Sequence, residues 1–236
     1  MNRNMLKAIA GSSFMLIIVL GAVRPGAAED PKAPYPTMAP IEKYSMDRND
    51  EIALARSAAP EAISSQAEVL VLGPKGYASA VKGANGFVCI VERSWAQDFD
   101  DAQFWNPKMR APICFNSPAA ASVLPPYLER TKMILAGESK DRVKESIAAA
   151  FDRKELSSPA PGSMCYMMSS HSYLNDSDGH WHSHLMFFAP TTDGAAWGAG
   201  LPGSPLLVAQ DPSEHLTVFM VLVSKWSDGT PSLHNQ

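Results

Sequence analysis

Three of the six histidines in this 236-residue chain fall within five residues, at alternate positions. The segment reads Asp176-Ser-Asp-Gly-His-Trp-His-Ser-His-Leu-Met-Phe-Phe188 and passes from a polar stretch into an apolar one. Alternate residues of a strand share a face, so we expect His180, His182 and His184 on one face and Trp181 on the other. Imidazole is the commonest metal ligand in proteins, and the pattern therefore predicts a metal site.

Such a site needs a further ligand. Neighbouring histidines on one face of a strand lie about 7 Å apart at Cα, and the outer two lie about 13 Å apart. One ion therefore requires a pair of histidines with a ligand from elsewhere, or a bulge that re-aims one ring. His171, nine residues upstream of His180 across an expected turn, is the nearest candidate. Zinc is the default ion, and copper or iron is the less favoured alternative.

A second hypothesis gives the histidines a structural role, as partners of turn carbonyl groups. The protein would then be a non-catalytic binding or interaction protein of the cell envelope. Trp105, Trp181 and Trp197 are its candidate ligand-contacting residues, because an indole ring offers a large apolar surface with a polar edge. The alternative for these aromatic side chains is that they cover the edge of a core.

The sequence assigns no catalytic residue. A metal with an open water position would suit hydrolysis, but no carboxylate at a telling spacing supplies a general base. The motifs of zinc proteases, α/β-hydrolases, P-loop proteins and dinucleotide-binding proteins are absent. Asp176–Gly179 resembles part of a calcium loop, yet that frame puts Leu174 and Leu185 at ligand positions, so a turn is expected instead. Whether the protein is an enzyme is left open.

The chain has three cysteines, Cys89, Cys114 and Cys165. In an oxidising compartment they allow one disulfide and one free thiol. Cys89 and Cys114 both lie in strand-like stretches, and we favour this pair. The alternative is that all three are small buried side chains.

Residues 1–28 have the form of a secretory signal peptide. A short basic segment precedes an uncharged apolar run of about 16 residues, and small residues end at Ala28. The run is shorter than the roughly 20 residues that span a bilayer, which favours a cleaved signal over an N-terminal membrane anchor. We therefore expect a periplasmic or extracellular protein whose mature chain has no stable membrane span.

Cleavage after Ala28 would leave 17 basic against 24 acidic residues, a net charge of −7. This balance argues against a nucleic-acid partner, which requires a basic face. It identifies neither a small-molecule nor a protein partner.

Residues 29–45 hold four prolines and are expected to form an extended, mobile lead-in to a single domain over residues 46–236. A helix is predicted over Asp47–Ala58, capped by Ser45 or Asp47. Strand-like runs at 67–72, 76–81 and 87–91 then suggest a small antiparallel meander.

The helical part is expected at 117–156. One helix with Pro126 near its start is predicted to end at Gly137, and the next has a buried stripe that includes Val143, Ile147 and Phe151.

Further strands are predicted at 163–168, 206–209 and 216–223. The last is apolar on both faces and should lie inside a sheet. Together these elements predict an α+β fold: a mainly antiparallel sheet with two or three helices packed on one face.

Overall fold

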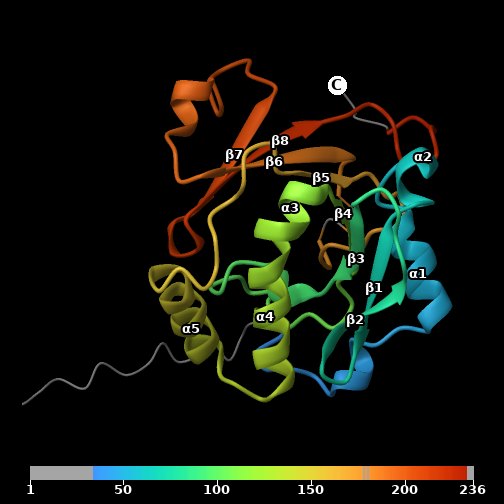
Figure 1. Cartoon of the computed structure of the whole chain (residues 1–236), viewed down its shortest axis with the longest axis vertical. Helices are drawn as coiled ribbons and strands as arrows, with labels where there is room; N and C mark the ends of the chain where they lie inside the picture. The colour runs from blue at the N-terminus through green and yellow to red at the C-terminus, as the bar shows by residue number, and fades with distance from the viewer. Residues whose placement is uncertain (1–33, 178, 180, 233–236) are drawn as a thin grey trace, which may run out of the picture.

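The computed structural model describes residues 34–177, 179 and 181–232. Its centre is an eight-stranded sheet in the order β2-β1-β3-β4-β5-β6-β8-β7 (Figure 1). The strands are β1 Glu68–Gly73, β2 Gly76–Val81, β3 Val88–Glu92, β4 Ala111–Phe115, β5 Met164–Met167, β6 His184–Pro190, β7 Leu206–Asp211 and β8 Leu216–Leu222. The helices are α1 Arg48–Arg56, α2 Glu61–Ser64, α3 Ser117–Ser122, α4 Leu124–Leu135 and α5 Lys140–Asp152, with 3-10 turns at η1 Ile41–Lys43, η2 Ser94–Ala96, η3 Gly194–Trp197 and η4 Pro212–Glu214.

The predicted α+β class and the mainly antiparallel sheet are confirmed, with one exception in strand direction. β1 and β2 form the expected antiparallel hairpin, but β3 pairs parallel to β1, through Glu68 with Val88 and Val69 with Cys89. The antiparallel meander predicted for these three strands is therefore wrong. The chain crosses from the end of the edge strand β2 back to the start of β1, where Glu68 N–H donates to the Phe87 carbonyl at 2.9 Å.

The helices lie on both faces of the sheet rather than on one. α3, α4 and α5 lie on the face that carries the larger core cluster, which includes Ile90, Ile113 and Phe115. The neighbouring positions of the same strands point the other way, and Cys89 and Cys114 pack there with Ala55 of α1. Figure 1 shows α1 on the opposite side of β1 from α4.

The ends of the helices follow their local sequence. The Asp47 carboxylate accepts from the backbone N–H of Asn49 and Asp50 and caps α1 as expected. Gly137 has a φ of 85°, a left-handed conformation that costs glycine little, and it follows Ala136, the C-cap of α4.

The described part of the proline-rich lead-in packs on the domain. Tyr44 is fully buried, and its hydroxyl donates to the Trp105 carbonyl at 2.8 Å. Tyr35, Met38 and Ile41 are partly buried against the same core. Burial of Tyr44 helps to hold this segment on the domain, because a large aromatic side chain removes about 150–250 Å² of surface from water.

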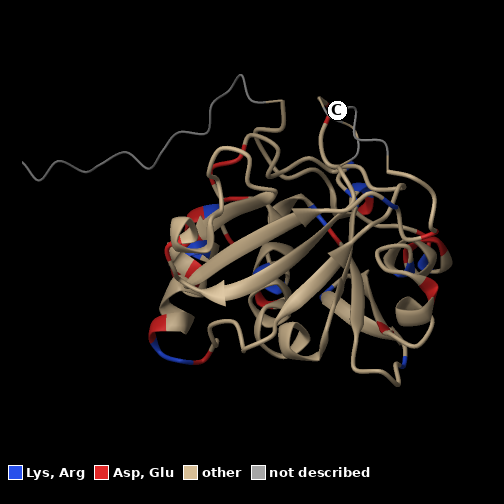
Figure 2. Ribbon diagram, turned by 90° about the horizontal axis from the view of Figure 1, so that it is seen from above, with Lys and Arg blue, Asp and Glu red and all other residues tan. Residues whose placement is uncertain are grey.

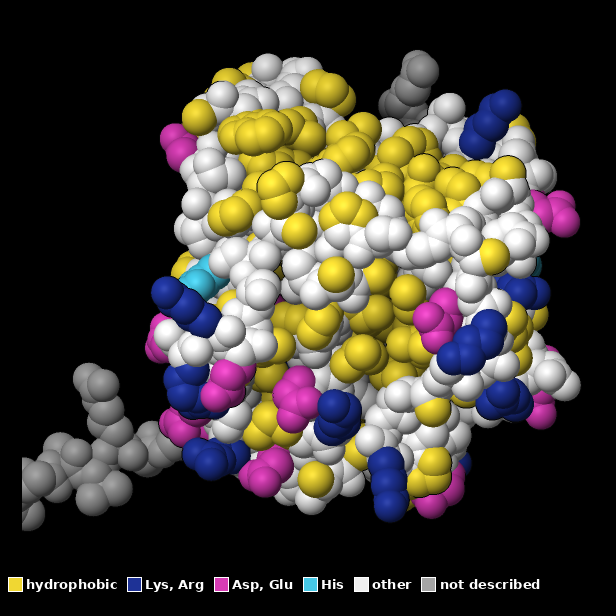
Figure 3. Space-filling model, viewed as in Figure 1, with side chains coloured by type: hydrophobic (Ala, Val, Ile, Leu, Met, Phe, Trp, Pro, Cys, Tyr) yellow, Lys and Arg dark blue, Asp and Glu magenta, His cyan; other side chains and the backbone are white. Residues whose placement is uncertain are grey.

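Charge is distributed unevenly over the molecule. The central strands are almost free of charged residues, which lie mainly on the flanking helices and loops (Figure 2). In the space-filling view, hydrophobic side chains gather at the top, in the region of β6, β7 and β8, whereas most charged side chains lie lower (Figure 3).

Candidate functional site

The histidine segment does not form one continuous strand. β6 begins at His184, and residues 181–183 precede it without regular structure. Trp181 and Ser183 are buried while His182 is exposed, yet His184 is buried. The alternation therefore breaks between residues 183 and 184, and the expected common face for His182 and His184 is not formed. His180 lies outside the described residues.

The His184 ring is held in one tautomer. Its Nδ1 lies 2.6 Å from the backbone carbonyl of His182, and because a carbonyl can only accept, Nδ1 must carry the proton. The ring packs edge-on against Trp181, with centroids 5.7 Å apart. Burial lowers the pKa of His184, and the bond to the His182 carbonyl only partly opposes this. His184 is accordingly a neutral imidazole at neutral pH.

His171 is exposed and lies close enough to Asp228 to lower the pKa of that carboxyl, after the bonds that Thr230 donates to it. Within residues 34–177, 179 and 181–232, no three side chains of His, Cys, Asp or Glu gather where they could hold a metal ion. The structure thus does not bring His171, His182 and His184 together as one ligand set.

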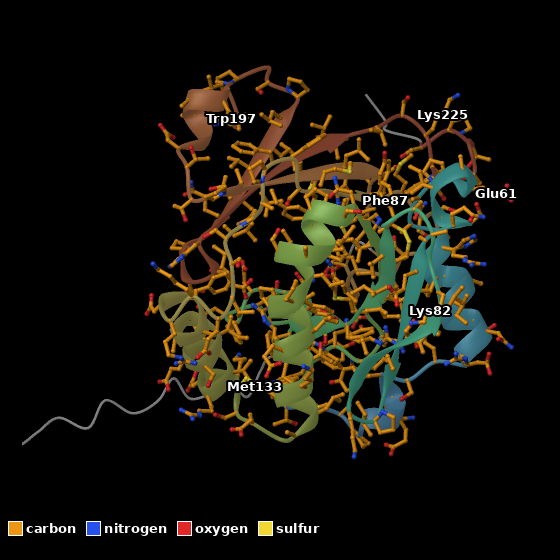
Figure 4. The ribbon with its side chains drawn as sticks, viewed as in Figure 1. Glu61, Lys82, Phe87, Met133, Trp197 and Lys225 are labelled. Carbon is orange, nitrogen blue, oxygen red and sulfur yellow. A yellow bond between two sulfur atoms is a disulfide. The ribbon has the colours of Figure 1, made fainter. Side chains whose placement is uncertain are left out.

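The three candidate tryptophans occupy different environments. Trp105 and Trp181 are buried, at 7% and 8% exposed, and pack in the main core cluster. Trp197 is 62% exposed and stacks on Phe219 of β8 at a centroid distance of 4.9 Å. Figure 4 shows Trp197 on η3, at the far end of the molecule from Met133 of α4. The aromatic residues around Trp105 thus cover the core.

Cys89 and Cys114 face each other in the antiparallel register of β3 and β4 and form a disulfide. Both are fully buried between the sheet and α1. Cys165 is a free, buried thiol on β5, and burial raises its pKa well above the usual value. The pairing favoured from the sequence is the one that the fold forms.

A cavity of about 230 Å³ lies between the sheet and α4, at the end where β7 turns into η4. Its apolar lining comes chiefly from β4, β6 and β8 and includes Ile113, Phe115, Met186, Phe188, Leu216 and Val218. Its polar lining includes Glu92, Asp98, Tyr127, Arg130, Asp211 and Glu214. An apolar pocket with a few converging polar groups is the usual form of a small-molecule site.

The strand period brings Glu92 into this cavity. Val88, Ile90 and Glu92 alternate along β3, so all three project toward α4. Glu92 is the last residue of the strand, beyond the fully buried Ile90, and remains partly exposed. The signal was present in the sequence, because a glutamate that continues the inward-facing positions of a buried strand must end in or beside the core.

Arg130 of α4 is fixed by several partners. Its Nη2 donates to the Glu214 carboxylate, and its Nη1 donates to the carbonyls of Trp95 at 2.9 Å and Gln97 at 3.2 Å. The guanidinium also lies 4.3 Å from the centre of the Phe99 ring. The Arg130 and Glu214 side chains are only 6% and 14% exposed. The two side chains of this ion pair form one side of the cavity, and the bonds described above hold them in place.

Glu92 is a partly buried acid of the cavity, and among the described residues no group hydrogen-bonds to its carboxyl. The charges of Arg130 and Glu214 are close enough to interact with it electrostatically. Burial raises the pKa of Glu92 to about 8, Arg130 opposes the rise and Glu214 adds to it. Glu214 itself has a raised pKa, first because it is buried. A carboxyl perturbed by burial in a cleft marks a candidate functional site.

A second hollow, of about 530 Å³, lies between α4 and α5. Its charged groups already pair with one another, Lys132 with Glu129 at 3.0 Å and Arg153 with Glu155 at 2.7 Å. It therefore presents no unsatisfied charge to a ligand, and the Glu92 cavity is the better candidate site.

No protein-family model matches this chain, and neither a curated protein nor a solved structure shows significant similarity to it. Across the described ranges, no helix combines the length and apolar character needed to cross a bilayer.

Proposed function

We propose that this protein is an exported binding protein for a small organic molecule, held in the cavity between the sheet and α4. The observation that carries the proposal is the Glu92 carboxyl, which faces an apolar cavity without a hydrogen-bonding partner. The carboxyl is only partly exposed, and no described group hydrogen-bonds to it. It is therefore available to pair with a polar group of a ligand that enters the cavity.

The cavity limits the size of the ligand. Its volume of about 230 Å³ corresponds to roughly seven or eight waters, at about 30 Å³ each in the liquid. The ligand must also offer apolar surface to the stacked rings of Phe115 and Phe188, whose centroids are 6.4 Å apart. A small molecule with an alkyl or aromatic body and one polar end fits these conditions.

The lining favours binding over catalysis. It contains no histidine, serine, cysteine or lysine among its described residues, so it lacks the usual nucleophilic side chains. Arg130 is occupied by Glu214 and by two carbonyl groups and is not free to stabilise a developing charge. We therefore assign recognition, and no reaction, to this site.

A filling substitution tests the proposal. Ala209 on β7 lines the cavity and Val208 points to the opposite face of the same strand. We expect Ala209→Phe to abolish binding of small amphiphilic fragments measured by calorimetry, and Val208→Phe to leave it intact. Equal binding by the wild type and Ala209→Phe would contradict the proposal.

Export is the second part of the proposal and rests on the signal-like residues 1–28. Cell fractionation with N-terminal sequencing tests it. We expect the mature chain to start at Glu29 in the exported fraction. Recovery of the intact N-terminus in the membrane would instead support the anchor.

A metal role for the histidine segment is a second candidate function, and one observation favours it. A histidine that binds metal through Nε2 usually donates from Nδ1 to a carbonyl or carboxylate, as His184 does to His182. Elemental analysis of protein purified without an affinity tag, then dialysed against zinc or copper, tests this role. Binding near one equivalent that falls in His182→Ala would support it, and less than about a tenth of an equivalent would exclude it.

A further inference from the structure

We infer that the ligand of the Glu92 cavity is an organic cation, a protonated amine with an apolar body. The inference rests on the proposed function and names the chemical class of its ligand. It starts from the charges that face the cavity: Glu92, Asp98, Asp211 and Glu214 are acidic, and Arg130 is the single cationic side chain in the described lining.

The single cation is already neutralised. Arg130 Nη2 is bonded to the Glu214 carboxylate, so these two charges cancel locally. The Asp211 carboxylate accepts from the backbone N–H of Ser213 and Glu214 and from the Ser213 hydroxyl, which hold it in place but carry no net charge. Within the described part of the chain, Asp98 and Asp211 have no cationic partner bonded to them, and Glu92 adds a further negative charge when it ionises. The cavity therefore carries uncompensated negative charge, which attracts cations and repels anions.

The position of Glu92 determines how a bound organic cation would be oriented in the cavity. The carboxyl lies at the end of β3, beside the apolar surface formed by Ile113, Phe115 and Phe188. An ammonium group that meets Glu92 would form a charge-assisted hydrogen bond, which is about twice as strong as a neutral one. Its hydrocarbon chain would then lie against the aromatic rings and lose its contact with water.

A neutral acceptor is the main competitor, because a protonated Glu92 could donate to a carbonyl or ether oxygen. The cationic and the neutral ligand differ in the number of protons that binding releases. An ammonium ligand replaces the proton on Glu92, so R–NH3+ and the carboxylic acid become an ion pair and one proton enters the solvent. Near neutral pH the pKa of free Glu92, raised to about 8, leaves most of the free protein with a protonated Glu92, so most binding events would release this proton from Glu92. A neutral acceptor would release none.

Calorimetry of the mature chain with three probes of equal length tests the inference: hexylammonium, 1-hexanol and hexanoate. We expect hexylammonium to bind at least about tenfold more tightly than 1-hexanol at pH 7.5, the effect of a hydrogen bond between charged groups. Hexanoate should show no binding. Titrations in phosphate and in Tris, whose ionisation enthalpies differ, should report proton release for hexylammonium alone.

Two variants test whether the preference for hexylammonium depends on the charge of Glu92. Glu92→Gln keeps the shape and removes the charge, and should reduce the preference for hexylammonium over 1-hexanol to about one. Glu129→Gln, the same change on the outer surface of α4, should leave the preference unchanged. If Glu92→Gln fails to fold, Glu92→Asp supplies the test, since it retains the charge and should retain the preference and the proton release.

The outcomes separate the inference from the proposed function. Equal or tighter binding of 1-hexanol would overturn the cation while leaving a working ligand site. Tighter binding of hexylammonium that persists in Glu92→Gln would also overturn it, because the charge of Glu92 would then be irrelevant. No binding of any probe would overturn both proposals together.

Discussion

Glu51 and Arg93 form an ion pair that is closed to solvent, with Arg93 Nη2 2.8 Å from Glu51 Oε1 and side chains 1% and 0% exposed. Each partner is bonded further. The same Glu51 oxygen accepts from Leu72 N–H at 3.1 Å, and Arg93 Nε donates to the Tyr44 carbonyl at 2.7 Å. Through these bonds the pair connects Arg93, the residue that follows Glu92, with α1, β1 and the proline-rich lead-in.

Breaking this pair should destabilise the fold strongly. Glu51→Gln leaves the Arg93 charge buried without its counter-ion, and removing one partner of such a pair costs about 3–5 kcal/mol. The free energy of unfolding in urea measures the loss. Glu129→Gln breaks the exposed pair with Lys132 and should cost less than about 1 kcal/mol. Equal losses in the two variants would show that the buried pair contributes no more to the free energy of unfolding than the exposed pair does.

Stability should fall as the pH rises through the range in which Glu92 ionises. The pKa of Glu92 is raised from 4.5 to about 8 in the folded chain, so folding binds its proton more tightly. Its contribution is fully present below the unfolded pKa near 4.5 and is lost as the pH approaches and passes about 8. Unfolding in urea at pH 5 and pH 8.5 should show the decline, and Glu92→Gln should make it shallower. A residual slope is expected from Glu214, whose pKa is also raised. A slope as steep in Glu92→Gln as in the wild type would contradict the assignment.

The disulfide should account for a sizeable part of the stability. Cys89 and Cys114 are 25 residues apart, and closing a loop of this length stabilises a fold by about 3.5 kcal/mol in the chain-entropy model. We expect the double substitution of both cysteines by alanine to lower the free energy of unfolding by about that amount. Unchanged stability would mean that the denatured chain is already compact between these residues.

Cys165 should resist thiol reagents in the folded protein. It is fully buried, and burial raises its pKa, so little reactive thiolate is present or accessible. Labelling with an aromatic disulfide reagent should titrate no thiol under native conditions and one thiol in denaturant. Fast native labelling would contradict the buried position of Cys165 on β5.

Much of the fold followed from local pattern. The stripe of Val143, Ile147 and Phe151 was predicted from its spacing, and all three side chains are buried in α5. The apolar strand at 216–223 was expected inside the sheet, and β8 lies between β6 and β7. These features depend on periods of 3.6 and 2 residues within one element, so neighbouring residues suffice to determine them.

Pairing between distant segments did not follow in the same way. Nothing local makes β3 parallel to β1, and the loss of alternation before His184 depends on how β6 joins β5 and β8. A shift of one residue reverses every side chain on a strand, so a histidine pattern in sequence does not fix a shared face in space.

The sequence by itself determined which strands are apolar and roughly where the longer helices begin and end, whereas it placed Glu92 just beyond the strand that the structure shows it to close. Only the tertiary structure decided that Glu92 meets Arg130 of α4 and Glu214 of η4 across one cavity. The reason is physical. The pKa of Glu92 and the commitment of Arg130 to Glu214 depend on burial and on distances between groups up to 122 positions apart in the chain, and neither quantity is present in the local order of residues.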